Sequence, residues 1–195
     1  MSRSTQPEIP NLTRVQVLLA MMVTAIILLA IAKVWIRLGR VPLLPIYWDL
    51  QVLWWGLGIS AFITLASATL YRFWPGYRQS AQYYVEMVLR PLLWWDLIWV
   101  GLLPGMSEEL LFRGVMLPAL GLTPVGVAIS SACFGALHLG GPKPWPYVVW
   151  ATIVGFILGT SAIVTGNLLV PVVAHAIVNW ISGSLWKWGQ HGKVV

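Results

Sequence analysis

Long apolar runs separated by short polar stretches dominate the chain. A helix needs about 20 apolar residues to cross the hydrocarbon core of a bilayer. Runs of this length predict four membrane-spanning helices, at residues 15–36, 50–71, 145–165 and 168–186. The first run follows a polar stretch and is too long for the apolar part of a signal peptide, so we expect it to remain as a helix.

The middle of the chain is less regular. Residues 72–90 mix aromatic and charged positions, which favours a helix at the membrane interface. We expect the chain to break at Pro104-Gly105 and a new helix to begin after Ser107, a residue type that caps helix starts. Residues 124–139 predict a further helix, rich in small residues that allow close packing. In total, the pattern predicts roughly six to eight helical segments, an all-α polytopic membrane helical bundle.

Composition agrees with this class. Hydrophobic residues make up 58% of the chain, charged residues 9%, and mean hydropathy is +0.79, whereas soluble domains carry about 25% charged residues. We therefore expect an integral, multi-pass membrane protein with membrane lipids as partners, in the plasma membrane if the source is bacterial. The net charge of +6 comes from cations near the ends of apolar runs, which is typical beside lipid headgroups and does not indicate nucleic acid.

Ionisable residues within apolar segments are functional candidates, because each costs about 2.5–3.5 kcal/mol on insertion scales. Glu109 and Arg113 are four residues apart, so they share a helix face and are expected to form an ion pair. Glu108 is rotated from Glu109 by about 100° and lacks a cation on its own face. A free carboxylate in a low-dielectric site can act as a general base or acid.

Two histidines extend this set. His138 follows Phe134 by one helical turn, and His175 and Asn179 are also one turn apart and face the same way. A histidine on an apolar face is more often a core residue than a functional one, but two histidines and an unpaired glutamate favour chemistry.

Two chemistries fit these residues. In one, Glu108 and His138 deprotonate a water while His175 and Asn179 stabilise an oxyanion. In the other, Glu108, His138 and His175 bind a catalytic zinc ion.

Other intramembrane hydrolase motifs are missing from the sequence. It has neither H-E-x-x-H nor G-x-S-x-G. A paired-aspartate protease needs two membrane aspartates, and Asp96 is the one candidate. Asp96 follows Trp94-Trp95, so we interpret it as a structural residue at the interface.

The sequence contains three motifs in this order: Glu108-Glu109-x-x-x-Arg113, Phe134-x-x-x-His138 and His175-x-x-x-Asn179. Together they resemble the motifs of the CPBP family of CAAX prenyl proteases and bacteriocin-processing proteins, also called the Abi family. The resemblance covers about residues 82–188. It implies a helical membrane endopeptidase with its catalytic domain at 82–188, an N-terminal region with two spans at 1–81, and a polar tail at 189–195.

The resemblance also implies roles for these residues. Glu108 and His138 would activate the water, and His175 and Asn179 would stabilise the oxyanion. Glu109, Arg113 and Phe134 would support the site. We favour a glutamic protease without a cofactor, because Asn179 then has a direct role; zinc on Glu108, His138 and His175 is the alternative.

The expected substrates are membrane-anchored proteins or peptides, among them CAAX-type prenylated proteins. Two other classes compete with this prediction. One is a non-proteolytic membrane immunity or scaffold protein of the same fold. The other is a proton- or ion-coupled transporter, for which intramembrane carboxylates and histidines are also typical, although the sequence has no internal repeat.

Overall fold

The structure, a computed structural model, describes residues 9–141 and 143–191. Within them, regular structure is helical and no strand occurs, which confirms the all-α membrane bundle. The helices are α1 (Arg14–Gly39), α2 (Leu50–Phe73), α3 (Pro75–Leu89), a 3₁₀ turn η1 (Trp94–Asp96), α4 (Leu97–Glu109), a π-helical segment η2 (Leu110–Met116), α5 (Leu117–Leu120), α6 (Pro124–Ala136), α7 (Trp145–Thr165) and α8 (Leu169–His191). Since α4, η2 and α5 follow one another without a break, they form one helix.

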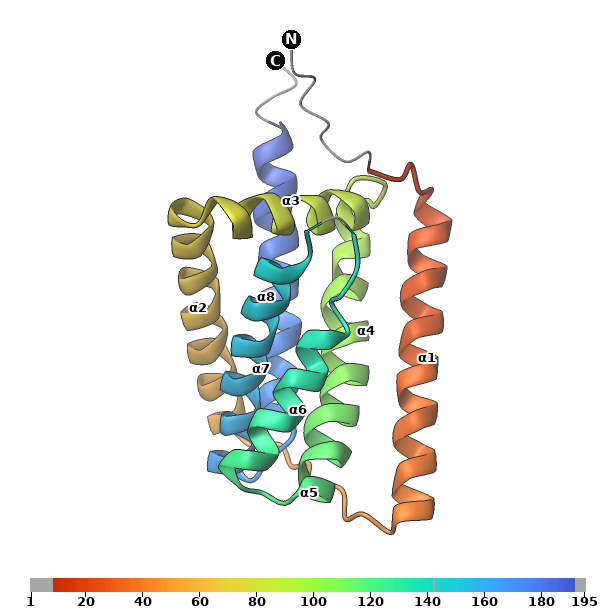
Figure 1. Cartoon of the computed structure of the whole chain (residues 1–195), viewed down its shortest axis with the longest axis vertical. Coiled ribbons are helices and arrows are strands. Elements are labelled where there is room, and N and C mark those ends of the chain that lie inside the picture. Colours follow the sequence, from red (N-terminus) through yellow and green to blue (C-terminus); the bar gives the residue numbers. More distant parts are fainter. Residues whose placement is uncertain (1–8, 142, 192–195) are drawn as a thin grey trace.

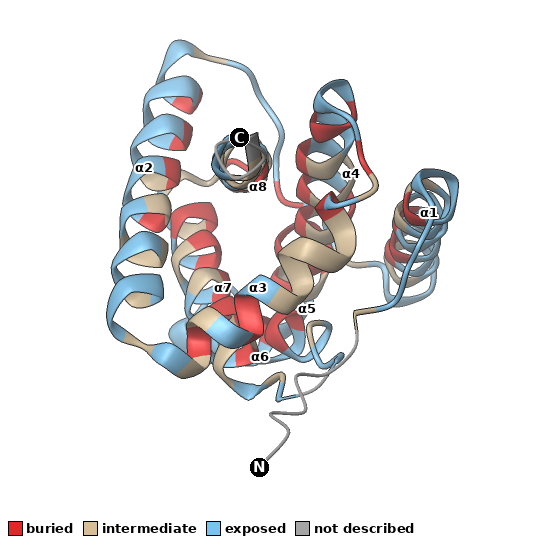
Figure 2. Cartoon of the chain, turned by 90° about the horizontal axis from the view of Figure 1, so that it is seen from above, coloured by how far each residue is buried: buried red, intermediate tan, exposed pale blue. Residues whose placement is uncertain are grey.

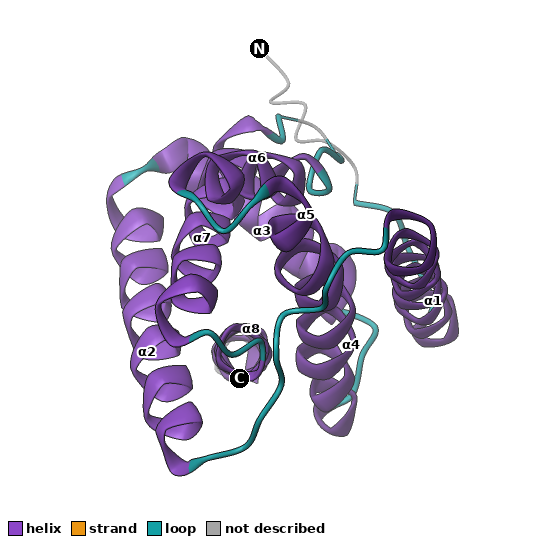
Figure 3. Cartoon of the chain, turned by 90° about the horizontal axis from the view of Figure 1, so that it is seen from below, coloured by secondary structure: helices purple, strands orange, loops and turns teal. Residues whose placement is uncertain are grey.

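Most of the helices run along the long axis of the molecule, while α3 lies across one end (Figure 1). The bundle seen from that end has α8 in its interior, between α2, α4 and α7 (Figure 2). The view from the opposite end shows the same arrangement, with α1 standing outside the bundle beside α4 (Figure 3). The interior helix α8 can therefore meet side chains from several neighbours.

The outer surface of the bundle is apolar. Large side chains such as Leu38, Trp54 and Leu65 are exposed, which in a membrane places them against lipid. Four helices, α1, α2, α7 and α8, are long and apolar enough to cross a bilayer. The segments Pro75–Leu89 and Trp94–Leu120 together are also apolar enough for a broken span or a re-entrant loop, with a bend of 110° between them. These findings place the protein in a membrane.

The predicted break at Pro104-Gly105 is wrong, and so is the predicted helix start after Ser107. Helix α4 passes through Pro104 without interruption, and the Ser107 hydroxyl donates a hydrogen bond to the Leu103 carbonyl, 2.7 Å away, within the helix. Proline is tolerated in membrane helices when other groups bind the carbonyl that it leaves free. Glu108 consequently lies in the last turn of α4, and the helix-start dipole that a break would have placed beside it is absent.

Two glycines set the contact between α4 and α8. A Cβ atom on Gly101 would lie 2.7 Å from the carbonyl oxygen of Ala176, and one on Gly105 would lie 3.0 Å from the backbone nitrogen of Ala176. The two backbones therefore approach too closely for side chains at these positions. This contact brings the turn of α4 that carries Glu109 against the turn of α8 that carries His175.

Candidate active site

Glu109 and Arg113 form the predicted ion pair, at 2.8 Å between Arg113 Nη1 and Glu109 Oε1, and both side chains are fully buried. Arg113 lies in η2, a π-helical segment of the kind that is frequent at functional sites. Its second amino group donates a hydrogen bond to the Gly155 carbonyl, 2.9 Å away on α7. A Cβ atom at Gly155 would lie 3.1 Å from Arg113 Nη2, so the glycine leaves room for the guanidinium.

His175 shares the same carboxylate. Its Nδ1 atom lies 2.8 Å from Glu109 Oε1, and the His175 side chain is buried. An ionised carboxylate only accepts hydrogen bonds, so Nδ1 carries the hydrogen in this contact and Nε2 is directed elsewhere. Glu109 thus orients the His175 ring and leaves Nε2 free to face another group.

Glu108 differs from Glu109 in its partners. Glu108 is partly buried, and its buried Oε2 atom has no hydrogen-bond partner among the described residues. Its carboxylate interacts electrostatically with Arg113 and His175, which places it in the same cluster. The predicted contrast therefore appears in the structure: Glu109 is held by a cation and a histidine, and Glu108 is next to them without such a partner.

His138 lies in the turn after α6, two residues beyond the helix end and slightly past its expected place within the helix. Its Nδ1 atom is 3.1 Å from the Phe134 carbonyl oxygen. A carbonyl oxygen can only accept, so Nδ1 carries the hydrogen here. The lone pair of a neutral His138 is then on Nε2, where it is available to a water or another ligand.

Phe134 joins the two histidines and the arginine. Its ring centroid lies 5.2 Å from that of His138 and 5.7 Å from that of His175. The Arg113 guanidinium carbon lies 4.4 Å from the Phe134 centroid, within the range of a cation–π interaction. The ring therefore packs against both histidines and against the cation that pairs with Glu109.

Asn179 lies one turn beyond His175 on α8, with its amide nitrogen 3.5 Å from the Val100 carbonyl oxygen. That carbonyl is the one that Pro104, which has no N–H group, leaves without its helical hydrogen bond. The contact is at the long limit of a hydrogen bond. The amide is thus close to α4 but weakly held.

The zinc alternative requires Glu108, His138 and His175 to lie close enough together to share one metal ion. Among the side chains of residues 9–141 and 143–190, no three His, Cys, Asp or Glu groups lie closely enough together to hold a metal ion. The nearest carboxylate to His175 is Glu109, which already binds Arg113. The predicted zinc ligands do not fit a metal site as these side chains stand.

Asp96 is buried and has a partner that the sequence pattern did not indicate. Its two carboxylate oxygens each lie 2.7 Å from nitrogens of Arg14, at the start of α1. The Leu93 backbone N–H also donates to Asp96. These contacts attach α1 to the start of α4, which supports the predicted structural role.

Two tyrosines lie beside His138 and were missed by sequence reasoning. The Tyr84 hydroxyl, on α3, is 2.7 Å from the His138 carbonyl oxygen and accepts a hydrogen bond from the Gly140 N–H. The Tyr147 ring, on α7, lies 5.6 Å from the His138 ring and stacks on Tyr84 at 4.7 Å. Both tyrosines come from aromatic-rich stretches that composition alone assigns to the membrane interface, and no motif sets them apart.

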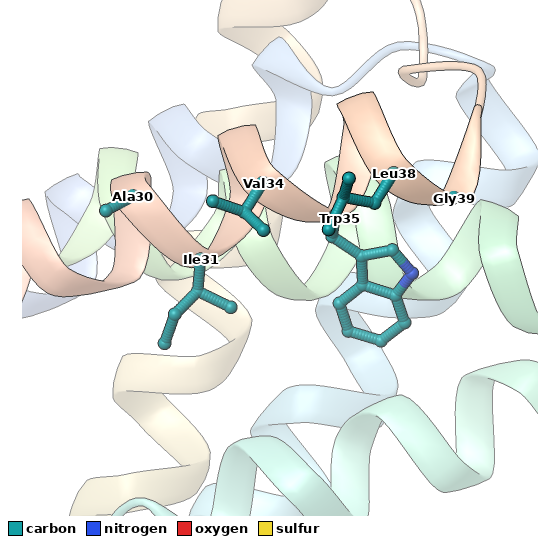
Figure 4. Close-up of a pocket in the computed structure, with 6 residues that line it drawn as sticks. All are labelled: Ala30, Ile31, Val34, Trp35, Leu38 and Gly39. Carbon is teal, nitrogen blue, oxygen red and sulfur yellow. The ribbon is translucent and has the colours of Figure 1, made fainter.

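A shallow apolar groove lies elsewhere, on α1 alone (Figure 4). It is lined by Ala30, Ile31, Val34, Trp35, Leu38 and Gly39. The groove has no ionisable side chain and belongs to the lipid-facing side of the bundle.

Comparison with known proteins identifies the relatives of this site. Residues 90–181 match the family model described as type II CAAX prenyl endopeptidase Rce1-like. The uncharacterized protein YpbD of Bacillus subtilis (strain 168) is 29% identical over 131 residues, which are 67% of this chain and 67% of YpbD. No solved structure gives a significant match. The seven predicted site residues, from Glu108 to Asn179, all lie inside the segment that the family model matches.

Proposed function

We propose a function from the premise that residues 90–181 of this chain belong to the Rce1-like family of type II CAAX prenyl endopeptidases. The protein hydrolyses peptide bonds of membrane-associated substrates, with a water that Glu108 and His138 activate. At the level of the family, the chain is of the CAAX-type intramembrane protease class. The observation that supports the finer proposal is a contrast between two neighbouring carboxylates. Glu109 binds Arg113 and His175 through Oε1, whereas Glu108 has no hydrogen-bond partner among the described residues.

In the proposed reaction, the water binds between the Glu108 carboxylate and His138 Nε2. Glu108 takes a proton from the water as its oxygen attacks the carbonyl carbon of the scissile peptide bond. The carbonyl oxygen becomes an oxyanion. When the tetrahedral intermediate collapses, the C–N bond breaks and the proton on Glu108 passes to the leaving amine.

The oxyanion would be stabilised from α8. A protonated His175, with Nδ1 bound to Glu109, offers its Nε2–H group. Asn179 offers an amide N–H that is only weakly bound to Val100, so it can turn toward substrate at little cost. A single donor of this kind contributes about 10²–10³-fold in kcat in proteases.

Glu109, Arg113 and Phe134 would support the site. Arg113 binds Glu109 and fixes its position, and Glu109 holds His175 in the orientation that presents Nε2. Phe134 packs against the rings of both histidines and would hold them in place. None of the three needs to touch the substrate for this role.

We propose a multi-pass membrane protein, in the plasma membrane if the source is bacterial, whose catalytic domain spans residues 82–188 after an N-terminal region at 1–81 and before a tail at 189–195. Ile63 of α2 and Trp150 of α7 share one core cluster, so the N-terminal spans pack on the catalytic part. Membrane lipids and a membrane-anchored protein or peptide, including a CAAX-type prenylated one, are the proposed partners. No cofactor is proposed.

A cleavage assay in nanodiscs tests the proposal. Wild type and Glu108→Gln would be compared on membrane-anchored and prenylated peptides, with and without a strong chelator. Cleavage by wild type alone, unaffected by chelator, supports a glutamic endopeptidase. Cleavage abolished by chelator and restored by zinc would overturn the glutamic type. No cleavage of any peptide by a folded wild type would favour the non-proteolytic alternative.

A further inference from the structure

Two charged side chains at the end of α3, Glu86 and Arg90, do not form the ion pair that their spacing allows. The Arg90 backbone N–H donates to the Glu86 carbonyl, 3.1 Å away, so the two residues are one helical turn apart and their side chains are neighbours. No ion pair or hydrogen bond joins either side chain to residues 9–141 or 143–190. Both charges are therefore available to a ligand.

The two side chains line one cavity. It has a volume of about 260 Å³ and is formed by residues 10–12, which precede α1, and by Glu86, Met87, Arg90 and Pro91. Its walls present an amide, a carboxylate and a guanidinium beside apolar side chains. Pockets that enclose a whole drug-sized ligand measure about 300–1,000 Å³. This cavity is therefore suited to a small group that carries both charges and has an apolar attachment.

The two walls of the cavity are held together by contacts next to it. Arg14, in the first turn of α1, binds both oxygens of Asp96 at 2.7 Å. Val17 of α1 and Leu89 of α3 belong to one core cluster. The start of α1 is thus fixed against the end of α3, at the end of the bundle that α3 crosses (Figure 1). A cavity whose walls are already in place binds a ligand at a lower cost in entropy.

The tryptophans that follow the cavity along the chain indicate its depth in the membrane. Trp94 and Trp95 are 45% and 68% exposed, just after Pro91. Exposed tryptophans of membrane proteins gather at the level of the lipid headgroups. The cavity therefore lies at the depth where the phosphate and amine groups of phospholipids are found.

We propose that this cavity binds the phosphoethanolamine headgroup of a phospholipid, with Arg90 on the phosphate and Glu86 on the ammonium group. A guanidinium forms strong charge-assisted hydrogen bonds with phosphate, and a carboxylate accepts them from an ammonium N–H. A choline headgroup has no N–H to donate, and a glycerol headgroup has no cation. The pair of charges therefore selects phosphoethanolamine. The site is separate from the proposed peptidase chemistry, and its test does not depend on cleavage.

The experiment follows the unfolding midpoint of the full chain in detergent, titrated with short-chain phosphatidylethanolamine, phosphatidylcholine or phosphatidylglycerol. A ligand that binds only the folded protein raises the midpoint. We expect the apparent Kd for phosphatidylethanolamine to be lower than that for the other two lipids by about tenfold, the contribution of one hydrogen bond between charged groups. Free phosphoethanolamine, which lacks the acyl chains, should shift the midpoint less than the lipid at the same concentration.

Two variants test the assigned contacts. Glu86→Gln keeps the shape of the side chain but removes its charge, so it should weaken binding of phosphatidylethanolamine to the level of phosphatidylcholine. Arg90→Gln should weaken binding of all three lipids by about tenfold, because each carries a phosphate. Arg72→Gln is the control, since Arg72 is exposed in the last turn of α2 and lies outside the cavity. In detergent without lipid, all three should unfold at the wild-type midpoint.

Three results would overturn the inference. One is an equal Kd of the wild type for phosphatidylethanolamine and phosphatidylcholine. The second is a preference for phosphatidylethanolamine that remains in Glu86→Gln. The third is an equal shift with free phosphoethanolamine and with the lipid, which would assign the cavity to a soluble ligand. None of them bears on whether the protein cleaves peptides.

Discussion

Replacing Arg113 with alanine tests whether the buried pair holds the site together. The change removes the hydrogen bond to Glu109 at 2.8 Å, the one to the Gly155 carbonyl at 2.9 Å, and the contact with the Phe134 ring at 4.4 Å. Removing one partner of a buried ion pair costs about 3–5 kcal/mol, because the other charge remains buried. His175 still binds Glu109 in the variant, so we expect a loss of stability at the lower end of this range and a loss of activity.

The measurement is equilibrium unfolding in detergent, followed by the helical signal, together with the cleavage rate. Arg90→Ala is the matched control, since Arg90 is an exposed arginine just after α3, and surface changes are usually within about 0.5 kcal/mol. Glu109→Leu combined with Arg113→Met should recover much of the lost stability but not the activity, because apolar side chains replace the pair without orienting His175. An Arg113→Ala protein with wild-type stability would show that the Glu109–Arg113 ion pair does not stabilise the fold.

Further substitutions probe other parts of the site. Gly101→Val should lower the free energy of unfolding by about 1–3 kcal/mol, because the Cβ of the valine would meet the Ala176 backbone. Denaturant titration measures this loss, and an unchanged midpoint would contradict the close contact between α4 and α8. Tyr84→Phe removes the hydroxyl that binds the His138 carbonyl, so it should lower the free energy of unfolding by about 1 kcal/mol and also lower kcat. Equal cleavage rates for Tyr84→Phe and wild type would show that Tyr84 does not position His138. Asn179→Ala should lower kcat by about 10²–10³-fold with little change in the unfolding midpoint, and wild-type turnover would remove Asn179 from the oxyanion site.

The helices at both ends of the chain could be predicted because length and hydropathy decide them. The predicted span at residues 145–165 coincides with α7, and the first two predicted spans differ from α1 and α2 by a few residues. The middle could not be predicted in the same way. Pro104 and Gly105 are strong helix breakers in water, but here they lie against α8. Asn179 of α8 approaches the carbonyl that the proline leaves free, and Ala176 occupies the space beside the glycine.

The ion pair of Glu109 with Arg113 followed from helical spacing and is confirmed. The spacing could not indicate that His175 binds Glu109 rather than Glu108, because that contact depends on how α4 and α8 pack. The same limit applies to Tyr84 and Tyr147, whose side chains reach His138 from α3 and α7. The catalytic roles of Glu108, His138, His175 and Asn179 stay predictions.

In the proposed mechanism, Glu108 activates the water while its neighbour Glu109 positions His175. The most direct measurement is the cleavage rate of Glu108→Gln and Glu109→Gln beside wild type in nanodiscs, with the unfolding midpoint of each protein. We expect Glu108→Gln to abolish cleavage and to keep the wild-type midpoint. Glu109→Gln should lower the midpoint, because it weakens the contacts with both Arg113 and His175. Cleavage by Glu108→Gln at the wild-type rate would exclude Glu108 as the group that activates the water.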